Sequence, residues 1–231
     1  MVGFTLNKKG KVLEHLPQNE QFSTPKEKRS IFFNLYNYYV EKEMRLTKDE
    51  MQNGENIYKV FQNKIESLKD KPLREKFMHL IGSGDHAKLL FDLDDMFLHL
   101  VYERAKKVNP KADLLLFENS IVIKDHRDDV SSTLLIPSYM KLDRVNIMSD
   151  PRVKKQMDEA CRTLNETEIK QVFLVYPKHP KFMKHISVDL NNKVKLRDEE
   201  YRVKMIPYSF SFCTKKQKIK TKTKNRRQEC Q

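Results

Sequence analysis

The chain has 231 residues, of which 39% are hydrophobic, and its 45 Lys and Arg against 32 Asp and Glu give a net charge of +13. This length and composition support one sizeable hydrophobic core or two small ones, and they exclude wholesale disorder. No apolar run approaches the roughly 20 residues that a membrane-spanning helix needs, and the start MVGFTLNKKGK lacks the apolar centre of a secretory signal. We therefore expect a protein that stays inside the cell.

The first 108 residues have the spacing of helices. Residues 24–27, Thr-Pro-Lys-Glu, combine an N-cap, a proline at the first helical position and a capping-box Glu, which predicts a helix over residues 25–45. A second capping box at residues 47–50 begins a helix that reaches about residue 69. A short helix then starts at Pro72 and ends at Gly82. These segments predict an antiparallel helical layer.

The stretch LLFDLDDMFLHL, residues 89–100, has two interpretations. It resembles the opening motif of the haloacid-dehalogenase-like phosphatases, in which a strand presents an Asp-x-Asp pair to Mg²⁺ and the first Asp attacks phosphate. Helical spacing fits the residues better, because no turn residue interrupts the chain from residue 86 to residue 107. One face of such a helix collects the apolar residues Leu90, Leu93, Phe97, Leu100 and Val101. We therefore expect one helix over residues 86–107.

The opposite face of this predicted helix is acidic and is a candidate metal site. It carries Asp92, Asp95, His99 and Glu103, spaced three, four and four residues apart. Carboxylates and an imidazole on one helical face suit several divalent cations, although a bundle-type site also needs acids on a facing helix. The alternative is an ordinary solvated face.

Asp94 falls on the apolar side of the same helical wheel. A carboxylate there needs a partner or a shifted pKa. The residues Arg104 and His86 lie on a neighbouring part of the wheel, so we expect a buried ion pair between this helix and the sheet.

After residue 110 the pattern changes to short apolar runs typical of strands. We expect strands at residues 113–117, 121–124, 132–137 and 171–176, a helix at 151–164, a hairpin over 185–196, and further strands at 201–206 and 209–212. The predicted fold class is α+β, with an N-terminal antiparallel helical layer followed by a mixed, mostly antiparallel β-sheet that contains one inserted helix. The expected organisation is a helical region over 1–108, a β-rich region over 109–213 that shares its core, and a disordered basic tail over 214–231.

The order of helix, three strands, helix and strand resembles the core of the restriction-endonuclease-like nucleases. In that family an Asp and a Glu-x-Lys motif on adjacent strands hold Mg²⁺ and position the attacking water. The nearest match is Asp113 with Lys124, Asp125 and Asp128, but Val122 stands where the family has Glu. The resemblance implies a nuclease that needs Mg²⁺ or Mn²⁺. The alternative is a charged hairpin end without chemistry, and no cofactor is then expected.

A basic loop after the fourth strand is a candidate contact surface for nucleic acid. Its candidate residues are Lys178, His179, Lys181, Phe182, Lys184 and His185. The cations are suited to phosphate contact and Phe182 to base stacking, unless the ring packs into the core.

The last 18 residues form a second basic segment. Their candidate contacts are Lys215, Lys216, Lys218, Lys220, Lys222, Lys224, Arg226 and Arg227, against the single acid Glu229. Such a tail is expected to be disordered when free and to suit polyanions, because each neutralised phosphate releases counterions. A solubilising end without a specific partner is the alternative.

Several other chemistries have little support in the sequence. The three cysteines, Cys161, Cys213 and Cys230, form no Cys-x-x-Cys pair, so we expect reduced thiols and no zinc site. The five glycines form neither a dinucleotide-binding nor a phosphate-binding loop, and no Gly-x-Ser-x-Gly elbow is present.

Three functional hypotheses follow. The first is a protein of the cytoplasm, associated with the nucleoid, or of the nucleus in a eukaryote, that binds nucleic acid through phosphate contacts with little sequence specificity. The second is a metal-dependent nuclease with a degenerate restriction-endonuclease-like core. The third is a protein-interaction module whose aromatic segment FFNLYNYY meets a partner helix.

Overall fold

A computed structural model describes residues 1–7, 9, 11–18, 24–52, 57–81, 88–124, 132–142, 147–190 and 201–210. Several predictions fall on residues outside these ranges: the basic tail, the candidate residues Asp125 and Asp128, His86, residues 211–212 of the last predicted strand, and the turn and second strand of the hairpin predicted near residues 191–196. Within the described residues, no helix is long and apolar enough to cross a bilayer.

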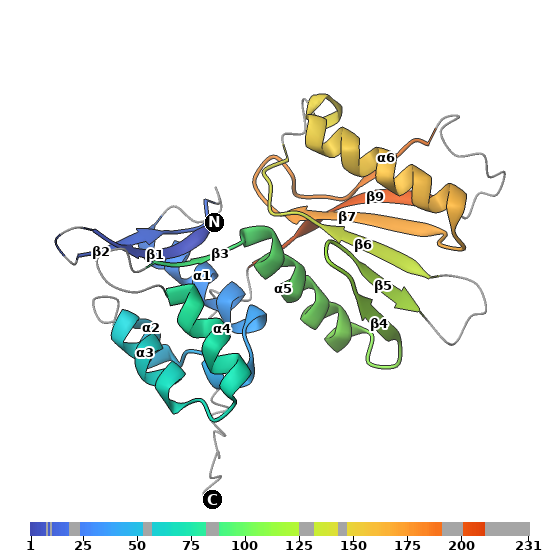
Figure 1. Ribbon diagram of the computed structural model, residues 1–231. Helices are drawn as coiled ribbons and strands as arrows, with labels where there is room; N and C mark the ends of the chain where they lie inside the picture. The colour runs from blue at the N-terminus through green and yellow to red at the C-terminus, as the bar shows by residue number, and fades with distance from the viewer. Residues whose placement is uncertain are drawn as a thin grey trace, which may run out of the picture.

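The N-terminal region combines helices with a small antiparallel sheet (Figure 1). Helices start within one residue of the predicted positions 25, 47 and 72. The segment predicted as one helix from residue 47 to about residue 69 is described as two helices on either side of residues 53–56, and the sheet was not predicted. The elements are β1 (Val2–Leu6), β2 (Val12–His15), α1 (Pro25–Tyr39), a 3-10 helix (Lys42–Met44), α2 (Lys48–Gln52), α3 (Ile57–Ser67), α4 (Lys71–Ile81) and β3 (Lys88–Phe91), with strand order β2-β1-β3.

Helix α1 starts at the predicted capping box. The Thr24 hydroxyl accepts from the Glu27 amide, and the Glu27 carboxylate accepts from the Thr24 amide at 3.2 Å. The helix ends at Tyr39 rather than at residue 45. Its rings Phe32, Phe33 and Tyr36 are buried and contact Phe4 of β1 and Phe91 of β3. This aromatic face belongs to the core, so the prediction that it meets a partner helix is wrong.

The stretch at residues 89–100 is a strand followed by a helix, so the prediction of one helix over 86–107 is wrong at its start. Strand β3, Lys88–Phe91, pairs with β1 along its whole length. Helix α5 (Leu93–Val108) begins after Asp92. Gly3 permits this pairing, because it adopts φ = +141° and a Cβ there would clash with the Leu89 carbonyl. The strand forms because β1, distant in sequence, supplies its hydrogen-bond partners.

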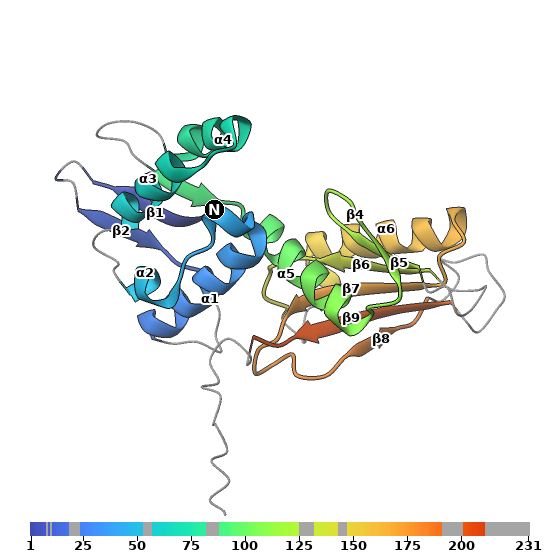
Figure 2. The same cartoon turned by 90° about the horizontal axis from the view of Figure 1, so that it is seen from below.

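The C-terminal region is a six-stranded mixed sheet between two helices (Figure 2). Its elements are β4 (Asp113–Leu116), β5 (Ile121–Lys124), β6 (Thr133–Pro137), a 3-10 helix (Ile147–Ser149), α6 (Pro151–Glu166), β7 (Gln171–Pro177), β8 (Ile186–Val188) and β9 (Arg202–Tyr208). The strand order is β4-β5-β6-β7-β9-β8. The pairs β6·β7 and β7·β9 are parallel and the other three pairs are antiparallel. The predicted α+β class with a mixed, mostly antiparallel sheet is confirmed.

Each face of this sheet has its own hydrophobic core. One core joins α5 and the N-terminal region to Ile121, Leu135, Val175 and Tyr208 of the sheet. The other core lies under α6 and includes alternate residues of β6, β7 and β9. Alternation of side chains along each strand produces this division. Helix α5 therefore packs between the N-terminal helices and the sheet, and it positions both regions.

Candidate functional site

The candidate residues of the sheet lie at its two opposite ends. Strands β4, β6, β7 and β9 run in one direction and β5 in the other, so Asp113 and Lys124 share the end at which β6, β7 and β9 begin. The basic loop at residues 178–185 follows β7 and lies at the end where the parallel strands finish. A strand of five residues spans roughly 16 Å. The predicted catalytic set and the predicted contact loop therefore do not form one site.

The first end holds the residues proposed for metal-dependent hydrolysis. Asp113 and Lys124 are direct cross-strand neighbours on β4 and β5, and both are exposed. Asp125 and Asp128 lie outside the described residues. Strand β6, whose sequence is TLLIP, carries no carboxylate. The described residues thus bring one carboxylate and one ammonium group together, and the set of Asp113, Lys124, Asp125 and Asp128 stays a prediction.

The second end contains a cavity of about 520 Å³. Its lining residues are Lys141, Leu142, Ile147, Ser149, Asp150, Pro151 and Arg152. They come from the segment after β6 and from the start of α6, where the carboxyl end of a parallel strand meets the N-terminus of a helix. Ligands of open α/β sheets bind at such ends. We call this region the carboxyl-end pocket.

The electrostatics of the carboxyl-end pocket centre on Arg152. The Asp150 side chain caps α6 by accepting from the Arg152 amide at 2.9 Å, and its second oxygen accepts from Arg152 Nη2 at 2.9 Å. These hydrogen bonds lower the pKa of Asp150 below its ordinary value and raise that of Arg152, to which the Asp94 charge also contributes. The Asp150 carboxylate therefore already occupies the N-terminus of α6, where a phosphate could otherwise bind. The surrounding lysines are the remaining groups suited to phosphate.

Asp94 does not form the predicted buried ion pair. It is exposed, and its carboxylate accepts a hydrogen bond from the Tyr139 amide near the carboxyl-end pocket. Arg104 instead donates to the Ser209 carbonyl at 3.3 Å and lies over the Tyr208 ring. His86, the other predicted partner, lies outside the described residues. The prediction of burial was wrong because α5 starts at Leu93, which changes the surroundings of its first turn.

The basic loop divides into buried and exposed residues. Phe182 is buried, and so is His179, whose Nε2 lies within hydrogen-bonding distance of the Leu142 carbonyl. Neither ring is accessible to a base in this conformation, so the stacking predicted for Phe182 does not occur there. Lys181, Lys184 and His185 are exposed, and Lys178 is half-buried. The contact between His179 and Leu142 ties the loop to the carboxyl-end pocket, so the lysines of both belong to the same end of the sheet.

Of the four residues proposed as metal ligands, Asp95, His99 and Glu103 lie on α5 and Asp92 lies just before it. Asp92 precedes α5 and caps it, accepting from the amides of Asp94 and Asp95 at 2.8 and 3.4 Å. His99 Nδ1 lies 3.0 Å from the Asp95 carbonyl oxygen, and its ring contacts Tyr39 of α1. Burial, followed by the neighbouring Asp92 charge, raises the pKa of Asp95. Among the described residues, no group of three or more His, Cys, Asp or Glu side chains is placed to hold a metal ion. The set of Asp92, Asp95, His99 and Glu103 stays a prediction.

The sequence analysis missed Lys141 and Arg152, which lie 11 residues apart on either side of residues outside the described ranges. The start of the helix at residue 151 was predicted correctly. Its place beside the end of β6 depends on the parallel pairing of β6 with β7, which no local pattern reveals. The sequence does contain a buried strand followed by a helix cap and a second buried strand, which is the pattern of a parallel crossover. This pattern would have indicated a ligand-binding end of the sheet where the first strand finishes and the helix begins.

The chain matches no protein-family model and no curated protein. Among solved structures it is similar to a chain in an assembly described as a half-complex of Thermococcus gammatolerans McrB AAA+ hexamers with bound McrC, at 10% identity and a TM-score of 0.46. The alignment covers 82% of this chain and 49% of that chain, so this chain spans about half the length of its structural neighbour. At these values the similarity establishes neither a common family nor a common function.

Proposed function

We propose that the chain acts on nucleic acid through the carboxyl-end pocket and the basic loop beside it. The observation that carries this proposal is the gathering of lysines from separate segments at one end of the sheet: Lys141 at the pocket, where Arg152 is paired with Asp150, and Lys181 and Lys184 on the loop. Phosphate contacts of this kind provide affinity and little sequence specificity. The predicted basic tail would add to this affinity as a second, independent phosphate-binding segment.

The element order of the sheet supports the nucleic-acid interpretation. Helix α5, the antiparallel meander β4-β5-β6, the crossover helix α6 and the parallel strand β7 follow the order expected for a restriction-endonuclease-like core. A fold does not by itself determine an activity, so the functional argument rests on the charged residues.

Binding is tested by fluorescence polarisation with labelled single- and double-stranded DNA and RNA across a salt series. In the full chain, the substitutions Lys141→Gln, Lys181→Gln and Lys184→Gln would be combined. The matched control removes the same charge from the N-terminal helical region with Lys48→Gln, Lys59→Gln and Lys69→Gln, all three residues being exposed. We expect the first variant to bind more weakly and to reduce the salt slope by about 2 for duplex DNA, and the control to reduce it by less than about 1.

A third variant separates the tail from the folded region. It carries Gln at all eight basic positions of residues 215–227 in the otherwise intact chain. We expect lower affinity with the effect of the pocket substitutions retained. If the tail variant loses all binding and the pocket variant behaves like its control, the folded region is not a nucleic-acid surface and the proposal fails.

Metal-dependent hydrolysis is a second candidate function, favoured by the element order and by the cross-strand pair of Asp113 and Lys124 beside the acidic segment 125–131. Labelled nucleic acid would be incubated with Mg²⁺ or Mn²⁺ and separated on a denaturing gel. A nuclease that uses these residues would lose cleavage with Asp113→Asn, Asp125→Asn or Asp128→Asn, and retain it with Asp49→Asn, an exposed acid of α2. Cleavage that all of these variants retain would assign the activity elsewhere or to a contaminant.

A further inference from the structure

The outer edge of the six-stranded sheet is apolar and exposed. Strand β4 ends the strand order, and on its outer side it pairs with no other described strand. The large hydrophobic side chains exposed on β4 and directly after it are Leu115 at 43%, Leu116 at 38% and Phe117 at 52% of their full accessible surface. An open strand edge with apolar side chains is a template for pairing with another chain.

We propose that β4 pairs in an antiparallel manner with β4 of a second copy of this chain, which joins two six-stranded sheets into one continuous sheet. The proposal concerns a different surface from the carboxyl-end pocket and stands independently of nucleic-acid binding.

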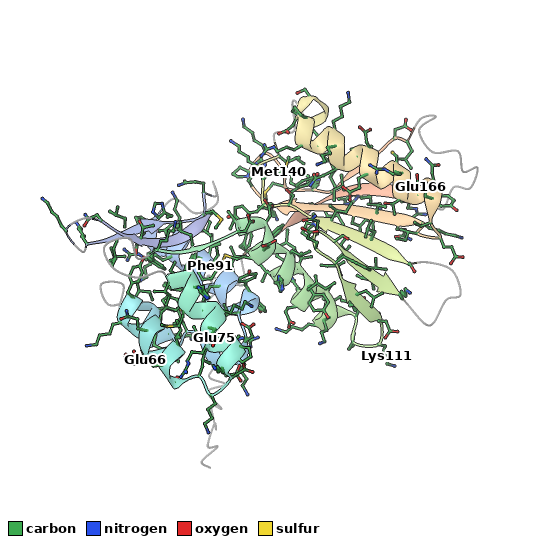
Figure 3. All side chains as sticks on the ribbon, viewed as in Figure 1. Glu66, Glu75, Phe91, Lys111, Met140 and Glu166 are labelled. Carbon is green, nitrogen blue, oxygen red and sulfur yellow. The ribbon has the colours of Figure 1, made fainter. Side chains whose placement is uncertain are left out.

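Charge along this edge favours an antiparallel second copy. At the end where α5 leads into β4, the exposed Lys106 and Lys111 outnumber the exposed Asp113, so this end is basic, and Figure 3 labels Lys111 there. The other end of β4 is acidic: Glu118 follows the strand and its charge reaches Asp95 at the start of α5. A two-fold axis normal to the sheet places the basic end of each copy beside the acidic end of the other. Parallel pairing would place like charges together.

Backbone geometry selects a register for this pairing. The Phe117 amide donates to the Ser120 carbonyl at 2.8 Å, so the backbone N–H and C=O of Phe117 point toward β5. Because these groups alternate in direction along a strand, those of Leu115 also point toward β5. The backbone groups of Leu114 and Leu116 then point outward. A two-fold axis normal to the sheet leaves each face of the sheet on the same side in both copies. Even-numbered residues of β4 therefore pair with even-numbered residues of the second copy, and odd-numbered residues with odd-numbered ones. If Leu114 lies opposite Leu116 of the second copy, the outward backbone groups of both residues form hydrogen bonds between the two strands. In this register Leu115 lies opposite Leu115 of the second copy.

The expected product is a reversible dimer. A single pair of short strands is at the small end of specific interfaces, so the dimer fraction should rise with protein concentration. Sedimentation velocity of the full chain, after nuclease treatment to remove bridging nucleic acid, would measure this fraction over a concentration series. A chain that remains monomeric at every concentration would overturn the proposal.

The first variant is Leu115→Lys, which places two ammonium groups directly opposite each other across the two-fold axis. We expect the dissociation constant of the dimer to rise by at least about 30-fold. The matched control is Leu13→Lys, because Leu13 lies on β2, an edge strand of the small sheet, and is 44% exposed. Equal effects of both substitutions, or an effect of the control alone, would refute the assignment to β4.

A crosslink tests the register and does not depend on weakening the dimer. In a background with Cys213→Ser and Cys230→Ser, Leu115→Cys would form a disulfide with its copy, because residues in a non-hydrogen-bonded antiparallel pair have Cα atoms about 4.5 Å apart, which suits the bond. Leu13→Cys in the same background should stay monomeric after oxidation. Failure of Leu115→Cys to crosslink above the level of this control would exclude the proposed register.

Charge reversal tests the antiparallel direction. Lys111→Glu and Glu118→Lys should each weaken the dimer by a few-fold, and the double variant should restore it, because each position faces the opposite end of the other copy. Circular dichroism and thermal midpoints would verify that all variants remain folded. A double variant weaker than either single variant would show that the two ends do not meet.

Discussion

Helices α5 and α6 are both 16 residues long and cover opposite faces of one sheet, yet they are buried differently. Helix α6 buries a single stripe formed by Val153, Met157, Ala160, Cys161 and Leu164. Helix α5 buries Met96, Phe97, Leu98, Leu100 and Val101, which include three consecutive residues and therefore more than one face. The reason is that α6 packs on the sheet alone, whereas α5 lies between the sheet and the N-terminal helices. A helix with one apolar stripe can be recognised from the spacing of its apolar residues. A helix between two layers cannot, because its apolar residues lie on more than one face.

The largest effect should come from truncating the centre of α5. The Phe97 ring contacts Tyr139, Tyr208 and Phe210, at centroid distances of 5.6, 5.5 and 5.9 Å. We expect Phe97→Ala to lower the free energy of unfolding by about 4 kcal/mol, near the upper end for buried aromatic residues. Leu164→Ala on α6 should cost about 3 kcal/mol. Urea unfolding monitored by circular dichroism would measure both.

The matched substitution Phe97→Leu retains much of the volume and should recover about half of the loss. If Leu164→Ala proves more costly than Phe97→Ala, the two layers do not depend on α5 and the contrast between the helices fails.

The same contrast explains which elements the sequence predicted. For α6, the cap at Asp150, the stripe and the strand that follows are all local, and the helix and strand predicted at residues 151–164 and 171–176 are confirmed. Strand β3 was missed because its partner β1 begins at residue 2, so its pairing depends on contacts more than 80 residues apart. Strand β3 has only three consecutive apolar residues, and so short an apolar run is otherwise indistinguishable from part of a helix.

The candidate site was predictable only in part. The exposed lysines of the basic loop were found from their spacing, but Phe182 was proposed as a stacking residue although it fills the core. Whether an aromatic residue in a loop points inward depends on the sheet behind it, which composition does not show. The carboxyl-end pocket arises from parallel pairing between β6 and β7, and the separation of the two candidate sets to opposite ends follows from strand direction. Neither feature has a local sequence pattern.

An intermediate effect should appear at high pH on the α5 side of the molecule. The Tyr58 hydroxyl donates to the Phe4 carbonyl at 2.7 Å, and burial raises the pKa of Tyr58 to about 12. An unfolded tyrosine ionises near pH 10. Between these values the native state binds more protons than the unfolded state, so stability should fall as pH rises from about 10 to about 12.

The substitution Tyr58→Phe should cost about 1 kcal/mol at neutral pH, through loss of the hydrogen bond, and should make the fall at high pH less steep. Tyr176, which donates to Gln156 at 2.6 Å under α6, also has a pKa raised by burial, so Tyr176→Phe is the comparison on the other face. Unfolding in urea at pH 8, 10 and 11 would separate the two contributions. Identical pH profiles for wild type and both variants would contradict the assignment.

The smallest effect concerns the aspartates that cap the two helices. Asp92 caps α5 beside Asp94 and Asp95, so its charge opposes theirs, whereas Asp150 caps α6 and pairs with Arg152 at 2.9 Å. Asp92→Ala should therefore cost only about 0.5 kcal/mol, because relief of repulsion offsets part of the lost cap. Asp92→Asn keeps an acceptor and removes the charge, so it should leave stability unchanged or raise it slightly.

Asp150→Ala should lower the thermal midpoint by more than Asp92→Ala does, because it also leaves Arg152 without this partner. The reverse order would indicate that a cation stabilises the acidic start of α5, as the predicted metal site requires.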